Sequence, residues 1–156
     1  RALGETRHVV RTLGEELDDG RGIVTIVEFS DWRLSMNDTN EIRSCVERYY
    51  ESLRGSDPAM VREVFHDNAK ITGYLPDGLH EMSVEDFAGF VEAQQPSPDA
   101  SGEPRMLEIL SCEVAGETAA VRLRESYLGM TFLDTFGMLR VDGRWTIYNK
   151  LFHVES

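Results

Sequence analysis

The last third of the chain constrains the fold most, because it consists of consecutive strand-like segments with very short breaks. The segments are residues 105–114, 118–128, 131–141 and 144–154. The breaks are Gly116-Glu117, Gly129-Met130 and Asp142-Gly143. Breaks of two residues that contain glycine are typical of tight β-hairpins. The sequence therefore predicts an antiparallel meander of four strands.

Tight hairpins fix the register of the strands, so the side chains that share a face can be predicted. The predicted inner face is mostly apolar and carries Met106, Leu110, Cys112, Val121, Leu123, Tyr127, Phe132, Phe136, Met138, Trp145, Ile147 and Leu151. The same register places a row of three acids on this face, Glu108, Glu125 and Asp134, with Asn149 and His153 diagonally beside Asp134. The opposite face, which suits solvent or a subunit partner, carries Arg122, Arg124, Ser126, Thr135, Thr146, Tyr148 and Lys150.

Carboxyl groups on an apolar face must find a partner, or their pKa rises and they hold a proton. Groups perturbed in this way are enriched at functional sites. The alternative is a longer turn or a frayed strand end, in which case Glu108 in particular reaches water. Glu125 and Asp134 are therefore the stronger candidates for a buried acidic site.

Helical patterns precede the meander. Apolar residues recur at helical spacing from residue 42 to residue 53, and Thr39 is the predicted N-cap. Residues 59–65 follow Asp57-Pro58 as a second helix, and Ser83 opens a third helix that ends at Val91. Short strands are predicted over residues 70–75 and 79–82. Helices followed by a meander indicate an α+β fold with the helices packed on one face of the sheet.

The chain divides at residue 35. Residues 36–156 are predicted to form one domain, and residues 1–35 an N-terminal extension to which we assign no role. Within this extension, residues 1–17 could form a helix and residues 22–27 a strand.

Composition narrows the classes of partner. The net charge is −12, so a nucleic-acid or anionic-membrane surface is not expected. Cys45 and Cys112 match no metal-ligand spacing and are predicted to be free thiols, while His66 and His80 are predicted to be solvated or capping. We expect no metal and no cofactor. The chain shows neither a secretory signal nor an apolar run of about 20 residues, which favours a cytoplasmic protein.

Two segments resemble a known superfamily. Val46-Glu47-Arg48-Tyr49, followed by Leu53, Asp57 and Phe65-His66-Asp67-Asn68-Ala69, resembles the opening of ketosteroid-isomerase-like proteins. Residues 142–153 resemble more narrowly the putative lumazine-binding branch of the same superfamily. The resemblance covers residues 39–155. It implies the cone-shaped fold of nuclear-transport-factor-2-like (NTF2-like) proteins, with three N-terminal helices on a curved antiparallel sheet and a pocket between the two layers.

The resemblance also implies roles for individual residues. Tyr49 matches the tyrosine that donates to the substrate oxyanion in the isomerases, and Asp134 matches the protonated acid that is the second donor there. The general-base aspartate of the isomerases is matched by Gly73, so the family route to steroid isomerisation is in doubt. Glu125 is our candidate for a relocated base, with His153 behind it.

Three functions remain open from the sequence. The first is a cofactor-independent enzyme that performs acid–base chemistry beside a carbonyl group, as an isomerase, cyclase (SnoaL-like) or lyase. The second is a binding protein for a small aromatic ligand, and the third is a dimeric interaction module whose pocket is filled by side chains. A homodimer is implied by the resemblance. The candidate ligand contacts are Phe65, Tyr74, Tyr127, Phe132, Phe136, Trp145 and Asn149.

Overall fold

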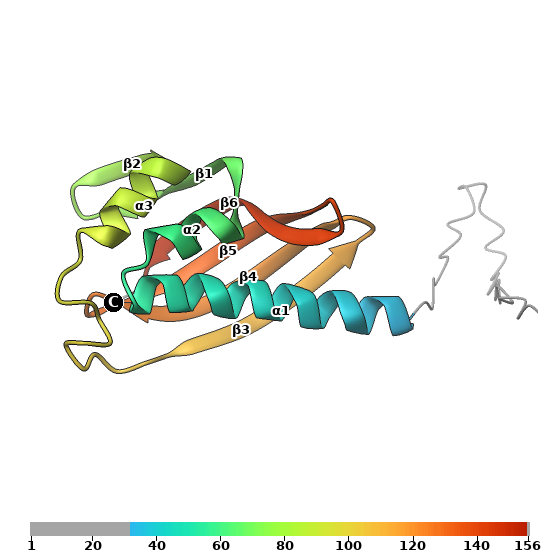
Figure 1. Ribbon diagram of the computed structural model, residues 1–156, viewed down its shortest axis with the longest axis horizontal. Coiled ribbons are helices and arrows are strands. Elements are labelled where there is room, and N and C mark those ends of the chain that lie inside the picture. The colour runs from blue at the N-terminus through green and yellow to red at the C-terminus, as the bar shows by residue number, and fades with distance from the viewer. Residues whose placement is uncertain (1–31, 156) are drawn as a thin grey trace, which may run out of the picture.

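The computed structural model describes residues 32–155, and within them the chain forms three helices and a six-stranded sheet. The helices are α1 (Trp32–Arg54), α2 (Pro58–Val64) and α3 (Val84–Glu92), and all of them lie on the same side of the sheet (Figure 1). This confirms the predicted α+β fold. The helix expected over residues 1–17 and the strand expected over residues 22–27 lie outside the described residues.

The helix starts follow the predicted caps in two cases. The Asp57 carboxylate caps α2 by accepting from the backbone N–H groups of Ala59 at 2.9 Å and Met60 at 3.0 Å. Ser83 and Asp86 form a reciprocal capping box at the start of α3. These side chains satisfy backbone N–H groups that have no partner within the first helical turn.

The first helix differs from the prediction, because α1 begins at Trp32 and not at Thr39. The Asp38 carboxylate accepts hydrogen bonds from Arg140 at 3.0 Å and from the Trp145 indole at 3.3 Å. These contacts hold the helix against the sheet before residue 39, so tertiary packing outweighs the local capping signal. The division between an extension and a domain at residue 35 stays a prediction.

The strands are β1 (Phe65–Leu75), β2 (Gly78–Ser83), β3 (Leu107–Ala115), β4 (Thr118–Tyr127), β5 (Met130–Val141) and β6 (Arg144–Val154). Their order in the sheet is β2-β1-β6-β5-β4-β3. Strands β3 to β6 form the predicted meander. The expectation of a wholly antiparallel sheet is wrong at one pairing, because β1 and β6 run parallel. The meander begins at the far edge of the sheet, and its last strand returns beside β1 in the same direction.

The turn between β4 and β5 lies one residue earlier than predicted. Leu128 and Gly129 have φ values of 51° and 74°, which is the left-handed pair of a type I′ turn. Asp134 therefore pairs with Leu123 and not with Glu125, which pairs with Phe132. The register is displaced by two residues, so Glu125 and Asp134 still share the inner face.

A bulge in β3 removes one member of the predicted acid row. The register between β3 and β4 shifts between Ile109 and Ser111, and this shift places Glu108 opposite Arg124 on the outer face. The Glu108 side chain is 60% exposed and lies 3.3 Å from the Arg124 guanidinium. The row of three acids was therefore wrong, and two acids remain inside.

A second irregularity, in β6, reverses the faces of the last residues of the chain. The pairing of β5 with β6 shifts between Gly137 and Met138, so Asp134 pairs with Phe152 and not with Leu151. Lys150 and Phe152 are consequently buried, whereas Leu151 is 54% exposed. The prediction that Lys150 lies on the outer face was wrong.

The core fills the space between the helices and the inner face of the sheet. Val46, Ile71, Leu123, Phe136 and Ile147 are all fully or almost fully buried there. Cys45 is buried, Cys112 is partly buried, and both are free thiols as predicted. Within the described part of the chain, no helix is both long enough and apolar enough to cross a membrane.

Candidate functional site

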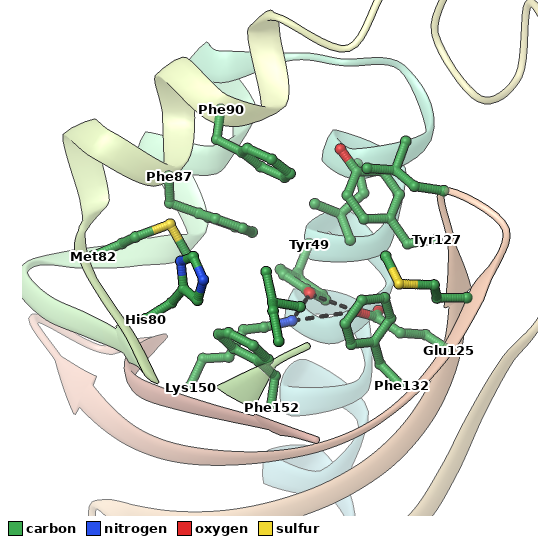
Figure 2. A pocket seen from close by; sticks show the side chains of 14 residues that line it. Tyr49, His80, Met82, Phe87, Phe90, Glu125, Tyr127, Phe132, Lys150 and Phe152 are labelled. Carbon is green, nitrogen blue, oxygen red and sulfur yellow. Dashed lines mark hydrogen bonds and ion pairs between the residues drawn. The ribbon is translucent and has the colours of Figure 1, made fainter. Parts of the chain in front are cut away.

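A cavity of about 190 Å³ opens between the helices and the sheet, at the end where β4 turns into β5 (Figure 2). Its walls come from α1, α3, the β1–β2 hairpin and strands β4 to β6. They are mostly apolar, and the lining residues are Tyr49, Leu53, Leu75, His80, Met82, Phe87, Phe90, Glu125, Tyr127, Leu128, Met130, Phe132, Lys150 and Phe152. A cavity with few polar groups in an apolar wall is the usual form of a small-molecule site.

A cluster of four polar side chains forms and supports the floor of the cavity, and three of them line it. Tyr49 comes from α1, Glu125 from β4, Asp134 from β5 and Lys150 from β6. All four are buried, with exposures of 0%, 1%, 0% and 4%. The Tyr49 ring is held edge-on against Phe136, with the ring centres 4.9 Å apart. The Tyr49 ring is therefore positioned by packing in the core.

Hydrogen bonds connect these four residues into one network. The Tyr49 hydroxyl lies 2.6 Å from Glu125 Oε1 and donates to it, and it lies 3.5 Å from Asp134 Oδ2. The Lys150 ammonium donates to the Tyr49 oxygen, to Asp134 Oδ2, and to Glu125 Oε1 at 3.3 Å. Glu125, Tyr49 and Lys150 line the cavity, whereas Asp134 lies behind them. Asp134 therefore holds the cavity-lining Lys150 in place without contacting the cavity itself.

Burial and charge set the protonation of the floor. Burial raises the pKa of Glu125 to about 8, opposed by the Lys150 charge and reinforced by Asp134. Burial opposes the charge of Lys150, but Asp134 and Glu125 outweigh it and the pKa of Lys150 lies above its usual value. Burial, followed by the charges of Glu125 and Asp134, holds the pKa of Tyr49 well above its usual value.

The raised pKa values mean that Glu125, Lys150 and Tyr49 all hold a proton at neutral pH. Two carboxyl groups share one ammonium, so the three groups are neutral together when one carboxyl is protonated. The raised pKa assigns that proton to Glu125. Tyr49 and Lys150 both donate to Oε1, which leaves Oε2 as the oxygen of Glu125 without a hydrogen-bond partner among the described residues.

Three buried polar atoms have no hydrogen-bond partner among the described residues: Glu125 Oε2, Asp134 Oδ1 and the Tyr127 hydroxyl. Glu125 and Tyr127 both line the cavity. An unpaired buried polar group costs about 1–3 kcal/mol. The unpaired atoms of Glu125 and Tyr127 are therefore candidate ligand contacts.

The wall opposite Glu125 carries a histidine (Figure 2). His80 lines the cavity from β2, and its Nε2 lies 2.7 Å from the Asp77 carboxylate. The His80 side chain is about one-third exposed. We predicted a solvated or capping histidine here, because residue 80 lies in a predicted loop or strand end, and no sequence signal indicated that this position faces a cavity.

The other predicted ligand contacts fall into two groups. Tyr127 and Phe132 line the cavity as predicted. Phe65 and Phe136 are buried in the core around the Tyr49 ring and do not reach the cavity. The aromatic core thus supports the floor and leaves contact with a ligand to the residues nearer the mouth.

Four predicted site residues lie elsewhere. Tyr74 is 66% exposed, and Trp145 donates its indole N–H to Asp38 at the other end of α1. Asn149 and His153 are exposed, and the Asn149 side chain accepts from the backbone N–H of Gly137 at 3.1 Å. The bulge in β6 explains both of these last two errors, since it turns residues 149 and 153 outward.

Lys150 is the member of the polar cluster that the sequence did not identify as a site residue. The apolar positions of β6 change parity, from Trp145 and Ile147 before the bulge to Phe152 after it. This change is the available signal for a bulge. It is ambiguous because Leu151 and Phe152 are both apolar.

The position that matches the isomerase base has no room for a side chain. A Cβ atom at Gly73 would lie 2.3 Å from the Phe152 carbonyl oxygen and 2.5 Å from its ring. Among residues 32–155, no group of three or more His, Cys, Asp or Glu side chains is arranged to hold a metal ion.

Comparisons with known proteins agree with this architecture. A family model described as "Putative lumazine-binding" matches residues 37–153. A curated protein named aldolase FrzH, from a Cladobotryum species, is 22% identical over 105 residues, which are 67% of this chain and 82% of that protein.

Solved structures extend the comparison of the fold. An NTF2-like protein of unknown function from Silicibacter pomeroyi is 21% identical, with a TM-score of 0.70 over 78% of this chain and 98% of the other. A second, from Shewanella baltica, is 23% identical with a TM-score of 0.68, over 78% and 96% of the two chains. A third, from Methylobacillus flagellatus, is 24% identical with a TM-score of 0.68, over 77% and 94%.

Proposed function

The chain belongs to the putative lumazine-binding family of NTF2-like proteins, and from this premise we propose that it catalyses proton transfer beside the carbonyl group of a small apolar compound. Glu125 is the group that meets the ligand oxygen. Tyr49 and Lys150 hold the other oxygen of Glu125, and Asp134 holds Lys150. The reaction class includes isomerisation, cyclisation, dehydration and aldol-type steps.

The observation that supports this proposal is that Glu125 lines the cavity while its buried Oε2 has no hydrogen-bond partner among the described residues. With its proton on Oε2, the carboxyl group is a neutral acid aimed away from its two donors. A ligand carbonyl oxygen is the acceptor that this proton lacks. Proton donation to such an oxygen lowers the barrier to forming an enol and contributes about 10²–10⁴-fold in rate.

The dimensions and chemistry of the cavity limit the ligand. Its volume of about 190 Å³ is smaller than the range of about 300–1,000 Å³ that is usual for drug-sized ligands. The walls contribute hydrocarbon and aromatic surface. The ligand is therefore a small, uncharged, largely hydrocarbon carbonyl compound.

One relative supports this class of reaction. The curated protein similar to this chain is named an aldolase, and an aldol step passes through an enol or enolate. Stabilising an enol is the task for which a buried neutral carboxylic acid is suited.

The experiment that tests the proposal is exchange of the α-hydrogens of cyclohexanone for deuterium in D₂O, followed by NMR. The wild-type protein is expected to accelerate exchange above the buffer rate. Glu125→Gln keeps the shape of the side chain but cannot transfer a proton, so we expect the accelerated rate to fall by about 100-fold.

The matched control is Glu113→Gln, the same chemical change at an exposed position of β3. It is expected to leave the rate unchanged. Absence of acceleration by the wild-type protein, with cyclohexanone bound as shown by chemical-shift changes, would contradict the proposal.

Binding without turnover is the second candidate function, favoured by the description of the family. Tyr127 and Phe132 present aromatic surface to the cavity, which suits a flat ring. The same experiment separates the two candidates, because a binding protein holds the ligand without exchanging its hydrogens. The interaction-module hypothesis required a filled pocket, and a cavity is present instead.

We also propose a homodimer formed through the outer face of the sheet. Leu110, Tyr148 and Leu151 are large apolar side chains exposed on this face. Burying them against a second copy would remove apolar surface from water. A cytoplasmic location remains a proposal from the sequence.

A further inference from the structure

The floor of the cavity supplies a proton donor, but carbonyl chemistry also needs a group that accepts a proton from carbon. Glu125 is poorly suited to this second task at neutral pH, since its raised pKa keeps it protonated. Asp134 is occupied by Lys150 and does not line the cavity. The acceptor should therefore be a cavity-lining group outside the floor.

Strand β2 brings His80 to the inner face of the sheet. His80 pairs with Gly73, and Gly73 pairs with Phe152, which in turn pairs with Asp134. Residues directly opposite one another on neighbouring strands point to the same face. Because Gly73 has no side chain, only Phe152 lies between His80 and the floor along this row.

The Asp77 carboxylate fixes the state of the imidazole. A carboxylate only accepts hydrogen bonds, so Nε2 of a neutral His80 carries the hydrogen and donates it to Asp77 Oδ1 at 2.7 Å. Nδ1 then holds the lone pair that can accept a proton. Asp77 thereby fixes the tautomer and the orientation of the ring, as the carboxylate does in other His–Asp pairs.

We propose that His80, oriented by Asp77, is the base that removes a proton from the carbon next to the ligand carbonyl, across the cavity from Glu125. This inference rests on the proposed function. His80 is the catalytic residue and Asp77 is the positioning residue. The substrate class is a small apolar ketone or aldehyde with at least one α-hydrogen.

The step balances with these two groups alone. Nδ1 of His80 takes the α-proton, and the C–H electron pair becomes the C=C bond of the enol. The carbonyl π pair moves to oxygen, which takes the proton from Glu125 Oε2. The products are an enol, an imidazolium and the Glu125 carboxylate, and the reverse step restores the starting state.

The partial exposure of His80 suits this role. His80 is about one-third exposed, so the imidazolium can exchange its proton with water between turnovers, whereas the floor is closed to water. A histidine that served only the β1–β2 turn would have no need to line the cavity.

The test is the cyclohexanone exchange assay with His80→Ala and Asp77→Asn. His80→Ala is expected to lower kcat by at least about 100-fold while KM changes little, because the base acts in the transition state. Imidazole added to His80→Ala is expected to restore a concentration-dependent part of the rate. Asp77→Asn is expected to lower kcat about 10-fold, also without a matching change in KM.

The matched control is His66→Gln, at a histidine of β1 that lies against Tyr148 and not in the cavity. Its exchange rate should equal that of the wild-type protein. Exchange by the wild-type protein that His80→Ala does not lower, or that imidazole does not rescue, would overturn the role of His80 alone. Absence of exchange by the wild-type protein would overturn both the proposed function and this inference.

Discussion

At the scale of single residues, the account depends on the protonation of Glu125. Its carboxyl group is completely buried, and burial raises its pKa from the ordinary value of 4.5 to about 8. The folded state therefore binds this proton more tightly than the unfolded state does. The stability contributed by the protonated group is present in full below pH 4.5 and is lost as the pH rises through 8.

The free energy of unfolding should therefore decrease between pH 5 and pH 9, and Glu125→Gln should weaken that decrease. We expect the difference in the free energy of unfolding between the wild-type protein and Glu125→Gln to change by about 2–4 kcal/mol between pH 5 and pH 9. Lys150 adds nothing here, because the pKa of Lys150 is raised from 10.5 and its contribution is lost only at higher pH. Urea unfolding at several pH values measures the effect, and parallel curves for the two proteins would contradict it.

The sequence was sufficient to predict that three members of the cluster are buried. Helical spacing placed Tyr49 on the inner face of its helix, and strand alternation placed Glu125 and Asp134 on the inner face of the sheet. The burial of Lys150 could not be predicted, since its orientation depends on one extra residue in β6. His80 is a different case. Its strand was predicted, but the position of that strand beside the cavity depends on the parallel pairing of β1 with β6.

At the scale of elements, hairpin turns and bulges decide which side chains reach the site. The type I′ turn at Leu128-Gly129 displaces the register by two residues and preserves the faces. A bulge displaces the register by one residue, so every side chain beyond it points to the opposite face of the sheet. The capping signals of α2 and α3 were local and predictable, whereas the bulges arise from packing between strands.

The contact between β1 and β6 provides a prediction at this scale. Gly73→Ala should lower the free energy of unfolding by at least about 3 kcal/mol, because its Cβ would lie 2.3 Å from the backbone oxygen of Phe152. Gly137→Ala is the matched control, since its Cβ would meet the Asn149 side chain at 2.8 Å. That side chain is exposed and can move.

Gly137→Ala should therefore cost about 1 kcal/mol, roughly the value of the hydrogen bond from Gly137 to Asn149 that would be lost. Thermal or urea unfolding of both variants makes the comparison. Equal losses of stability in the two variants would show that β1 and β6 are not packed as described.

At the scale of the whole molecule, the layer arrangement was predictable from the order of the patterns, helices first and a meander last. The parallel pairing of β1 with β6 was not predictable, because no local sequence pattern indicates which strand lies beside β1. The outer face of the sheet carries the exposed side chains of Leu110, Tyr148 and Leu151, and we propose that a second copy of the chain covers them.

Sedimentation velocity at micromolar concentration should show a dimer, and Leu151→Glu should dissociate it. Leu151 lies on the central strand β6 of the outer face, so a buried charge there would be costly. Met36→Glu, at an exposed apolar residue of α1, is the control that should remain dimeric. A monomeric wild-type protein would contradict the dimer.

The central claim is that the floor of the cavity donates a proton to a ligand carbonyl, and the infrared stretching band of that carbonyl tests it most directly. For cyclohexanone bound to the wild-type protein, we predict a C=O band at lower frequency than in water, because a buried acid polarises the bond more strongly than solvent does. Tyr49→Phe removes one of the two donors that hold Glu125 Oε1, and its bound ligand should show a smaller shift. A bound carbonyl whose frequency resembles that in an apolar solvent, unchanged by Glu125→Gln, would contradict the account.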